Sequence, residues 1–186
     1  MSCVSAPRTD PQTLPSGQWQ LDTHHASVTW QVRHFGLSWV TGRFDTFDAS
    51  LDFDPENPER AQLSAAINAA SVSTGNPEFD DTLRDSGWLN ADLHPQIFFE
   101  LESLTITGEQ TGTARGNLTL KGQTRSVDMM IEFYGGNYNF LESREAIGFG
   151  ADMVIERTDF GIGFLPDGIA GDTIRIRIEA EFLLQR

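Results

Sequence analysis

The chain has 186 residues, with 27 acidic and 13 basic side chains and a formal net charge of -14 at pH 7. A chain of this length can form one all-β domain with a substantial core. The acidic surface repels phosphate backbones and anionic bilayers, so the net charge disfavours nucleic acid and docking on a membrane surface. The single cysteine, Cys3, excludes an internal disulfide.

Residues 1–17 are polar, punctuated by prolines and free of hydrophobic periodicity. This pattern predicts a flexible N-terminal tail before one barrel domain over residues 18–186. Two readings of Cys3 stay open. It is either the lipidated cysteine of a trimmed lipoprotein, which would tether the protein to a membrane, or part of a disordered tail that begins with a cloning remnant. We expect neither a membrane-spanning segment nor a secretion signal in the chain as given.

Apolar or aromatic residues alternate with polar ones within residues 19–44. The inward positions are Val28, Trp30, Val32 and His34. This period of two marks a strand with one buried face, and a tryptophan beside a histidine on that face indicates a lined cavity. We expect an interruption near residues 24 and 25, a turn at residues 35–36 and a second strand over residues 37–44.

The alternation continues along most of the remaining chain. Inward rows are expected within residues 47–53, 63–69, 97–106, 114–120, 127–133, 147–155 and 174–184. Between them, Pro77 and acids in a first turn predict a short helical segment near residues 77–93, lying over one end of the sheet. Residues 135–146 predict an exposed polar loop, and a glycine-rich loop is expected from Asp159 to Gly171.

About eight to ten half-buried strands with little helix imply an all-β barrel or sandwich. Closure into a barrel would remove exposed sheet edges, which matters in a chain so rich in strands. The interior of an eight-stranded barrel is just wide enough for side chains or for one slender ligand. The inward aromatic and aliphatic rows suit an apolar occupant.

Signatures of enzymes and metal sites are missing from the sequence. We find no zinc-protease helix motif, nucleophile elbow, phosphate loop or dinucleotide fingerprint, and the four histidines show no ligand spacing. We therefore expect no metal, no cofactor and no catalytic residue. His34 is either a satisfied polar residue near a barrel end or a contact for the polar head of a ligand. Arg84 forms a helix salt bridge with Asp80, or it binds a phosphate head group.

The chain contains many short motifs that match a known family. No single motif is decisive, but their order and spacing together are specific. They include Trp19-x-Leu21-Asp22, the series His25, Val28, Trp30, His34 and Gly36, then Asp80-x-x-Leu83-Arg84, Gly116-x-Leu118-Thr119 and Arg157-x-Asp159-Phe160-Gly161-Ile162. Over about residues 18–184 the chain resembles the YceI-like family of polyisoprenoid-binding, lipocalin-like proteins. It departs from the family pattern at Phe79, where Arg is usual, at Thr82, where His is common, and at Leu101, near which Ser is usual.

The resemblance implies an extended antiparallel eight-stranded lipocalin-like barrel that holds a long isoprenoid in its pore. It also implies export to the bacterial periplasm, commonly without a known reaction. We therefore predict non-enzymatic binding, transport or storage of a long-chain isoprenoid or related lipid, such as a polyprenyl phosphate or an isoprenoid quinone. The predicted ligand-binding residues are Val28, Trp30, Val32, Phe53, Ile67, Ile97, Phe99, Phe149 and Ile176, with His34 and Arg84 nearer a polar end.

Two alternatives remain on the sequence alone. A filled, ligand-free barrel would serve as a protein-interaction module, and an enzyme acting on a lipid or quinone would use His34 as general acid or base. The second alternative requires another titratable group beside His34 on an inward face. The sequence does not decide whether the protein forms a homodimer. A lipid is the one bound partner that we expect.

Overall fold

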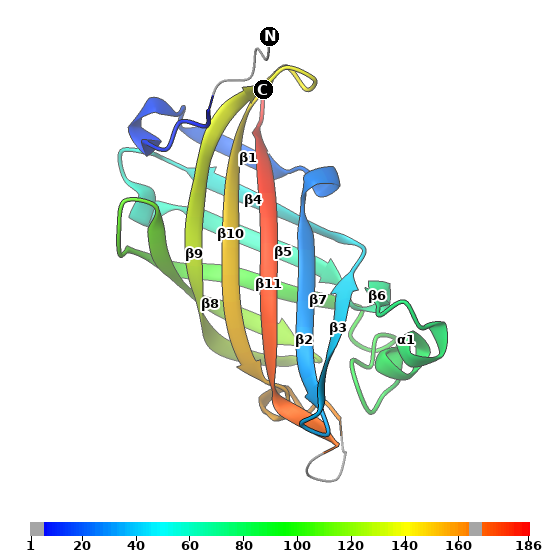
Figure 1. Cartoon of the computed structure of the whole chain (residues 1–186). Helices are drawn as coiled ribbons and strands as arrows, with labels where there is room; N and C mark the ends of the chain where they lie inside the picture. Colours follow the sequence, from blue (N-terminus) through cyan, green and yellow to red (C-terminus); the bar gives the residue numbers. More distant parts are fainter. Residues whose placement is uncertain (1–5, 164–168) are drawn as a thin grey trace.

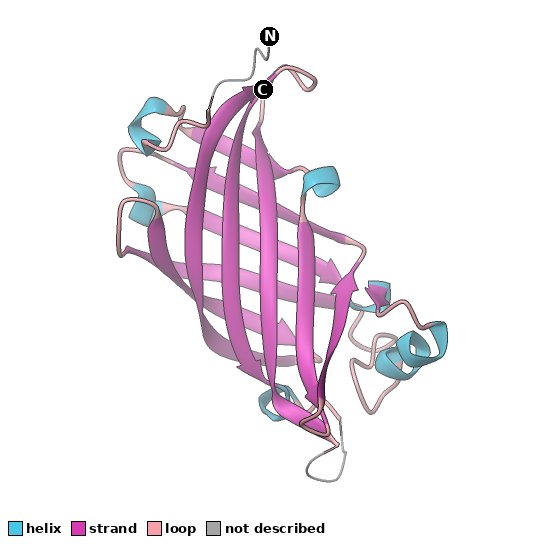
Figure 2. Cartoon of the chain, in the orientation of Figure 1, coloured by secondary structure: helices cyan, strands magenta, loops and turns pink. Residues whose placement is uncertain are grey.

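The fold is seen in a computed structural model of the chain, which describes residues 6–163 and 169–186. Long strands wrap around one another into a single barrel (Figure 1). Nearly all of the regular structure is strand, and the helical turns lie at the ends or the side of the barrel (Figure 2).

The strand segments come from the alternating stretches of the sequence, because period-two patterns place one face inward. They are β1 (Gly17–Leu21), β2 (Ser27–His34), β3 (Ser38–Phe44), β4 (Phe47–Phe53), β5 (Gln62–Asn68), β6 (Val72–Ser73), β7 (Gln96–Ile106), β8 (Thr111–Leu120), β9 (Gln123–Asn139), β10 (Arg144–Glu156) and β11 (Ala170–Leu184). The helices are α1 (Pro77–Arg84) and the short 3-10 helices η1 (Pro11–Thr13), η2 (Thr23–His25), η3 (Pro58–Arg60), η4 (Ala69–Ser71) and η5 (Arg157–Phe160).

These segments form eight barrel strands, because three barrel strands are each interrupted once. β1 and β2 both pair antiparallel with β11, with Trp19 opposite Leu184 and Val28 opposite Ile178. β4 and β3 continue the ladder by pairing with β1 and β2, and β5 and β6 pair with β4 and β3 in turn. β7, β8, β9 and β10 complete the ring back to β11. The expected closed antiparallel eight-stranded barrel is confirmed, and so is the interruption near residues 24 and 25, where η2 lies.

The N-terminal segment differs from the expected flexible tail. Arg8 pairs with Gly136 through two backbone hydrogen bonds of 2.8 and 2.9 Å, and its guanidinium binds Glu145. Leu14 is only 5% exposed and packs with Trp19 and Ile147. Residues 6–16 are thus part of the folded domain. One isolated apolar residue produces no periodicity, so the sequence pattern could not reveal this packing. Residues 1–5, including Cys3, lie outside the described residues.

The helix α1 ends earlier than the expected helical segment. Asn76 caps its N-terminus by accepting the Phe79 amide at 3.4 Å, and Pro77 occupies the first turn. The backbone becomes extended at Asp85, and residues 85–93 form successive turns, with a positive φ of 52° at Asn90. The extended backbone at Asp85 ends the helix, so only residues 77–84 are helical.

The predicted loop over residues 135–146 is largely paired strand. Ladder pairing between β9 and β10 extends to Tyr138 opposite Glu145 and to Asn139 opposite Arg144. The turn itself is limited to residues 140–143. The hairpin extends past the barrel core, and its base is covered by the segment around Arg8 and Leu14. The glycine-rich loop after η5 is described only in part, since residues 164–168 lie outside the described chain.

The two ends of the barrel are built differently. At the end bearing the β9–β10 turn, which we call the packed end, a compact apolar cluster lies inside the barrel. It consists of Leu14, Trp19, Leu21, Leu51, Phe53, Phe133, Ile147 and Phe182. The opposite end, which we call the mouth end, carries the β2–β3 hairpin and the start of β11 (Figure 1). Within the described residues, no helix has the length and apolar character needed to cross a membrane.

Candidate ligand cavity in the barrel

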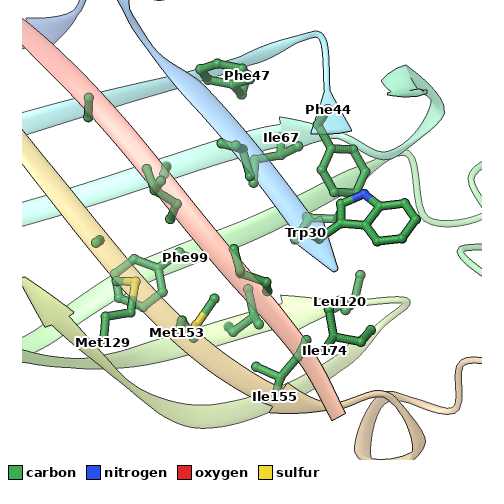
Figure 3. Close-up of a pocket in the computed structure, with 18 of the residues that line it drawn as sticks. Trp30, Phe44, Phe47, Ile67, Phe99, Leu120, Met129, Met153, Ile155 and Ile174 are labelled. Atoms are coloured by element: carbon green, nitrogen blue, oxygen red, sulfur yellow. The ribbon is translucent and has the colours of Figure 1, made fainter. Parts of the chain in front are cut away.

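The barrel encloses an apolar cavity of about 410 Å³. This volume falls in the range of ordinary small-molecule pockets, about 300 to 1,000 Å³. All but five of its lining residues are apolar, and they come from every barrel strand. Figure 3 shows side chains from β2, β3, β5, β7 and β10 converging on the same space. The arrangement can bury a slender apolar molecule and offers it few hydrogen-bond partners.

Ten of the eleven predicted site residues line this cavity. They are Val28, Trp30, Val32, His34, Phe53, Ile67, Ile97, Phe99, Phe149 and Ile176. Exposure rises along β2 from Val28, which is buried, through the half-buried Trp30 to His34, which is exposed. The cavity therefore reaches solvent at the mouth end. That these residues bind a ligand stays a prediction.

Trp30 owes its orientation to a glycine on the neighbouring strand. It lies directly opposite Gly42 in the β2–β3 ladder, and a Cβ at Gly42 would overlap the indole ring. The ring therefore covers Gly42, close to Phe44 (Figure 3). The Phe99 ring likewise lies over Gly116 of β8, although Gly116 is opposite Leu101 in the ladder and so diagonal to Phe99. The sequence shows both glycines, but only the strand register reveals that each accommodates an aromatic ring.

His34 lies at the rim of the cavity, where its side chain is exposed. Its imidazole packs edge-on against Phe35, with 4.7 Å between ring centroids. No hydrogen bond or ion pair involves the imidazole within residues 6–163 and 169–186. These contacts do not test either reading of His34, so both stay predictions. The second titratable group that the enzyme alternative requires is not bonded to the imidazole.

Arg84 is not among the lining residues, contrary to the prediction. Its guanidinium donates to the carbonyls of Ala70 at 2.8 Å and Val72 at 3.0 Å. A third bond, at 2.7 Å, joins it to Asp81. These contacts attach α1 to η4 and β6, so Arg84 fixes the helix beside the barrel. Sequence spacing placed Arg84 on the helix correctly but could not show which way the side chain points.

Asp80 is also not the partner of Arg84. It is buried, and one of its carboxylate oxygens accepts hydrogen bonds from the Thr74 amide at 2.7 Å and the Thr74 hydroxyl at 2.6 Å. The carboxylate thereby fixes the loop that leads into α1. The expected pair of residues 80 and 84 is replaced by the exposed pair of Asp81 and Arg84.

Arg157 is a buried cation that the sequence reading did not select. It is 7% exposed, lines the cavity near the mouth end, and has no carboxylate partner among the described residues. Its guanidinium instead donates to the carbonyls of Ile162, Gly163, Ala170 and Gly171 at 2.7 to 3.4 Å. Four carbonyl dipoles replace the lost hydration of the charge. Its place in the recognised Arg157-x-Asp159-Phe160 motif was the available signal.

One group in the described part of the chain has the donor atoms for a metal ion. Ligand atoms of Asp22, His25 and Glu181 lie within 4.8 Å of one another, outside the cavity lining. Nδ1 of His25 already forms a hydrogen bond of 2.8 Å with Asp22. That bond raises the pKa of His25. Burial alone would raise the pKa of Asp22, but hydrogen bonds from His25 and the His24 amide outweigh it, so this pKa is lowered. Asp22 and His25 therefore form an ion pair across η2, of which Asp22 is the N-cap.

Further lining residues belong to the predicted inward rows but were not selected as site residues. Figure 3 shows Phe44, Leu120, Met129, Met153, Ile155 and Ile174 among them. Methionine side chains adapt readily to irregular ligands because they are flexible and polarisable. The alternation identified their face, but the extent of the cavity depends on how the barrel closes.

A closed antiparallel barrel with a continuous apolar interior defines a class of proteins that can hold one slender ligand. Residues 19–182 match the family model of the YceI-like domain. The chain therefore belongs to the YceI-like family, as the motifs indicated.

Known relatives agree with this assignment. A UPF0312 protein of Ectopseudomonas mendocina is 35% identical over 162 residues, covering 87% of this chain and 83% of the relative. A UPF0312 protein of Azotobacter vinelandii is 34% identical over 138 residues, covering 74% and 71%.

Solved structures agree as well. The YceI protein of Campylobacter jejuni is 28% identical, with a TM-score of 0.75 over 83% of this chain and 90% of that one. A polyisoprenoid-binding domain from Saccharophagus degradans is 13% identical, with a TM-score of 0.68 over 92% of this chain and 100% of that one. At that identity the second likeness concerns the fold alone.

Proposed function

We propose that this protein binds a long-chain isoprenoid or a related amphiphilic lipid inside the barrel and carries or stores it without chemical change. The observation that carries the proposal is the apolar cavity of about 410 Å³. Membership of the YceI-like family supports it, as does the shared fold with a polyisoprenoid-binding domain. We further propose that the protein acts in the bacterial periplasm and needs no cofactor.

The energetics allow tight binding without many polar contacts. Burial of roughly 500 Å² of prenyl surface at about 25 cal/mol/Å² gives about 12 kcal/mol of gross stabilisation. Loss of translational and conformational freedom takes back several kcal/mol, and submicromolar affinity remains within reach. A polar head group would lie at the mouth end beside the exposed His34, because the packed end offers it only apolar side chains.

The two alternatives receive less support. An interaction module would be favoured by a filled interior, whereas the cavity leaves room for a ligand. An enzyme would need a group that works with His34, and no carboxylate or amine within the described chain bonds to its imidazole. Binding is therefore the function that the site supports best.

The test is native mass spectrometry of freshly purified protein, followed by extraction and identification of the released lipid. We expect a stoichiometric adduct that extracts as an isoprenoid. Trp30→Asp places a charge in the cavity and should abolish the adduct, whereas Val154→Asp, on an exposed residue outside the lining, should retain it. A bare polypeptide mass that does not change after incubation with prenyl lipids or quinones would refute the proposal.

A further inference from the structure

The mouth end carries an exposed apolar tip. The β2–β3 hairpin ends at Phe35 and Leu37, which are 54% and 86% exposed. The tip lies beside the cavity rim, because His34 lines the cavity and packs against Phe35. Large apolar side chains at a hairpin tip cannot contribute to the barrel core, so their presence there needs another explanation.

The backbone of the tip is unfavourable for Phe35. Phe35 and Gly36 have φ values of 48° and 69°, and the Leu37 amide donates to the His34 carbonyl at 2.9 Å. Two central residues with positive φ characterise the tight hairpin turn that prefers Asn-Gly. An aromatic residue in the left-handed region costs about 1 to 2 kcal/mol relative to glycine. The unfavourable backbone at Phe35 points to a role outside folding.

Cationic side chains flank the tip on the outer face of the barrel. The guanidinium groups of Arg33 and Arg175 lie 4.8 and 4.5 Å from the ring of Trp39, one from β2 and one from β11. Neither forms an ion pair with a carboxylate in residues 6–163 or 169–186. Stacking on an aromatic ring leaves the charges available to an external anion. Trp39 is itself 37% exposed, as suits a residue at an interface between water and lipid.

We propose that Arg33, Phe35, Leu37, Trp39 and Arg175, which we call the docking tip, attach the mouth end to an anionic lipid bilayer. This inference rests on the proposed function, because docking would place the cavity rim where a lipid enters or leaves. Phe35 and Leu37 would insert among the lipid tails, and the two arginines would meet anionic head groups. The occupant is a bilayer because exposed apolar side chains occur at the tip together with two arginines that form no ion pair within residues 6–163 and 169–186.

The overall negative charge does not prevent this contact. Strand β11 alone is about 50 Å long, since it has 15 residues and a strand rises about 3.3 Å per residue. Charges are screened beyond about 8 Å at physiological ionic strength. A bilayer at the tip would therefore sense the local arginines far more strongly than the carboxylates at the packed end. The formal net charge of -14 describes the average surface, whereas Arg33 and Arg175 lie together on Trp39 at the tip.

The packed end supplies a matched control. At the β9–β10 turn, Phe140 and Leu141 are 69% and 93% exposed, so this tip is as apolar as the first. Two carboxylates, those of Glu142 and Glu181, lie near this tip, since both act on His25. The tip has no described counterpart of the two arginines that stack on Trp39. Equal apolarity without that arginine pair separates specific docking from nonspecific hydrophobic adsorption.

The experiment is co-sedimentation of the full chain with vesicles of phosphatidylglycerol and phosphatidylethanolamine, compared with vesicles of phosphatidylcholine. We expect binding to the anionic vesicles at low salt and weak binding to the neutral ones. The double variant Phe35→Asn with Leu37→Asn should lose at least about tenfold in partitioning. The double variant Arg33→Gln with Arg175→Gln should lose about 30-fold on anionic vesicles only. Phe140→Asn with Leu141→Asn should bind as the wild type does.

Each outcome decides the proposal. The proposal is overturned if the wild type does not bind anionic vesicles or if the docking-tip variants bind as well as the wild type. It is also overturned if the control variant loses as much binding as the docking-tip variants. Misfolding is separated by thermal melting, since Asn suits a positive φ and Phe35→Asn should melt no lower than the wild type. Failure of the lipid-binding proposal is distinguishable as well. Trp30→Asp should lose its extracted lipid and still dock on vesicles.

Discussion

The two ends of this barrel have similar hairpin tips, but the interior behind each tip is stabilised differently. Both hairpin tips expose two large apolar side chains, Phe35 with Leu37 and Phe140 with Leu141. The packed end rests on one apolar cluster. The rest of the barrel contains a second apolar cluster, and arginine side chains that bind backbone carbonyls add to it at the mouth end. Hydrophobic packing fills space, while hydrogen bonds from a long side chain fix loops and leave space open. The difference shows how one barrel can be stable and hollow at once.

The largest effect is expected from Trp19→Ala at the packed end. Trp19 is 1% exposed within the cluster, so truncation should leave a cavity and cost about 3 to 5 kcal/mol in the free energy of unfolding. Urea denaturation would measure this loss. Trp19→Phe should cost less than half as much, because the indole Nε1–H has no acceptor among the described residues. Equal losses for the two variants would contradict the packing argument.

Arg157→Met tests the mouth end in the same assay. The change leaves the buried carbonyls that bind Arg157 without their donor, and we expect a loss of about 2 to 4 kcal/mol. Arg177→Gln is the control, because Arg177 forms ion pairs with Asp152 and Glu179 on the outer surface and should contribute less than about 1 kcal/mol. A loss for Arg157→Met no greater than that of the control would show that the mouth end is not held in this way.

Gly42→Ala tests whether the orientation of Trp30 affects both the stability of the protein and ligand binding in the cavity. The added methyl group overlaps the Trp30 indole, which must shift toward the cavity, and we expect a loss of about 1 to 3 kcal/mol with less bound lipid. Denaturation and native mass spectrometry would measure the two effects. Gly87→Ala has open space around its Cβ and should change neither. Unchanged lipid content in a destabilised Gly42→Ala protein would separate Trp30 from ligand binding.

The smallest effect concerns the ion pair of Asp22 and His25. The raised pKa of His25 means that its contribution to stability is fully present below the usual value of 6.5 and is lost as pH rises through the folded value. The lowered pKa of Asp22 means that its contribution is present above the usual value of 3.8 and is lost as pH falls through the folded value. The pair therefore stabilises most between these limits. His25→Gln should lower the urea midpoint of unfolding near pH 5.5 and have less effect near pH 8. The same decrease at both pH values would show that the charge of His25 does not contribute to stability.

Sequence patterns predicted the face of each strand better than they predicted side-chain direction outside the strands. The row of Val28, Trp30, Val32 and His34 lies along the cavity as expected, because a strand has a period of two and a one-residue error would reverse every face. Arg84 was misplaced, because a residue on a short helix can point toward the barrel mouth or toward neighbouring carbonyls with the same local sequence. Leu14 was missed for a related reason, since only the closed barrel provides the surface it covers.

By itself, the sequence determined the all-β class, the inward rows, the apolar character of the interior and the family. Each of these follows from local alternation or from motifs, and both can be read from the sequence without knowledge of contacts. Only the tertiary structure decided that Trp30 covers Gly42, that Arg157 is held by carbonyls and that Arg33 and Arg175 meet on Trp39. These arrangements join residues far apart in the chain, and their geometry depends on strand register and barrel closure, which no local pattern encodes.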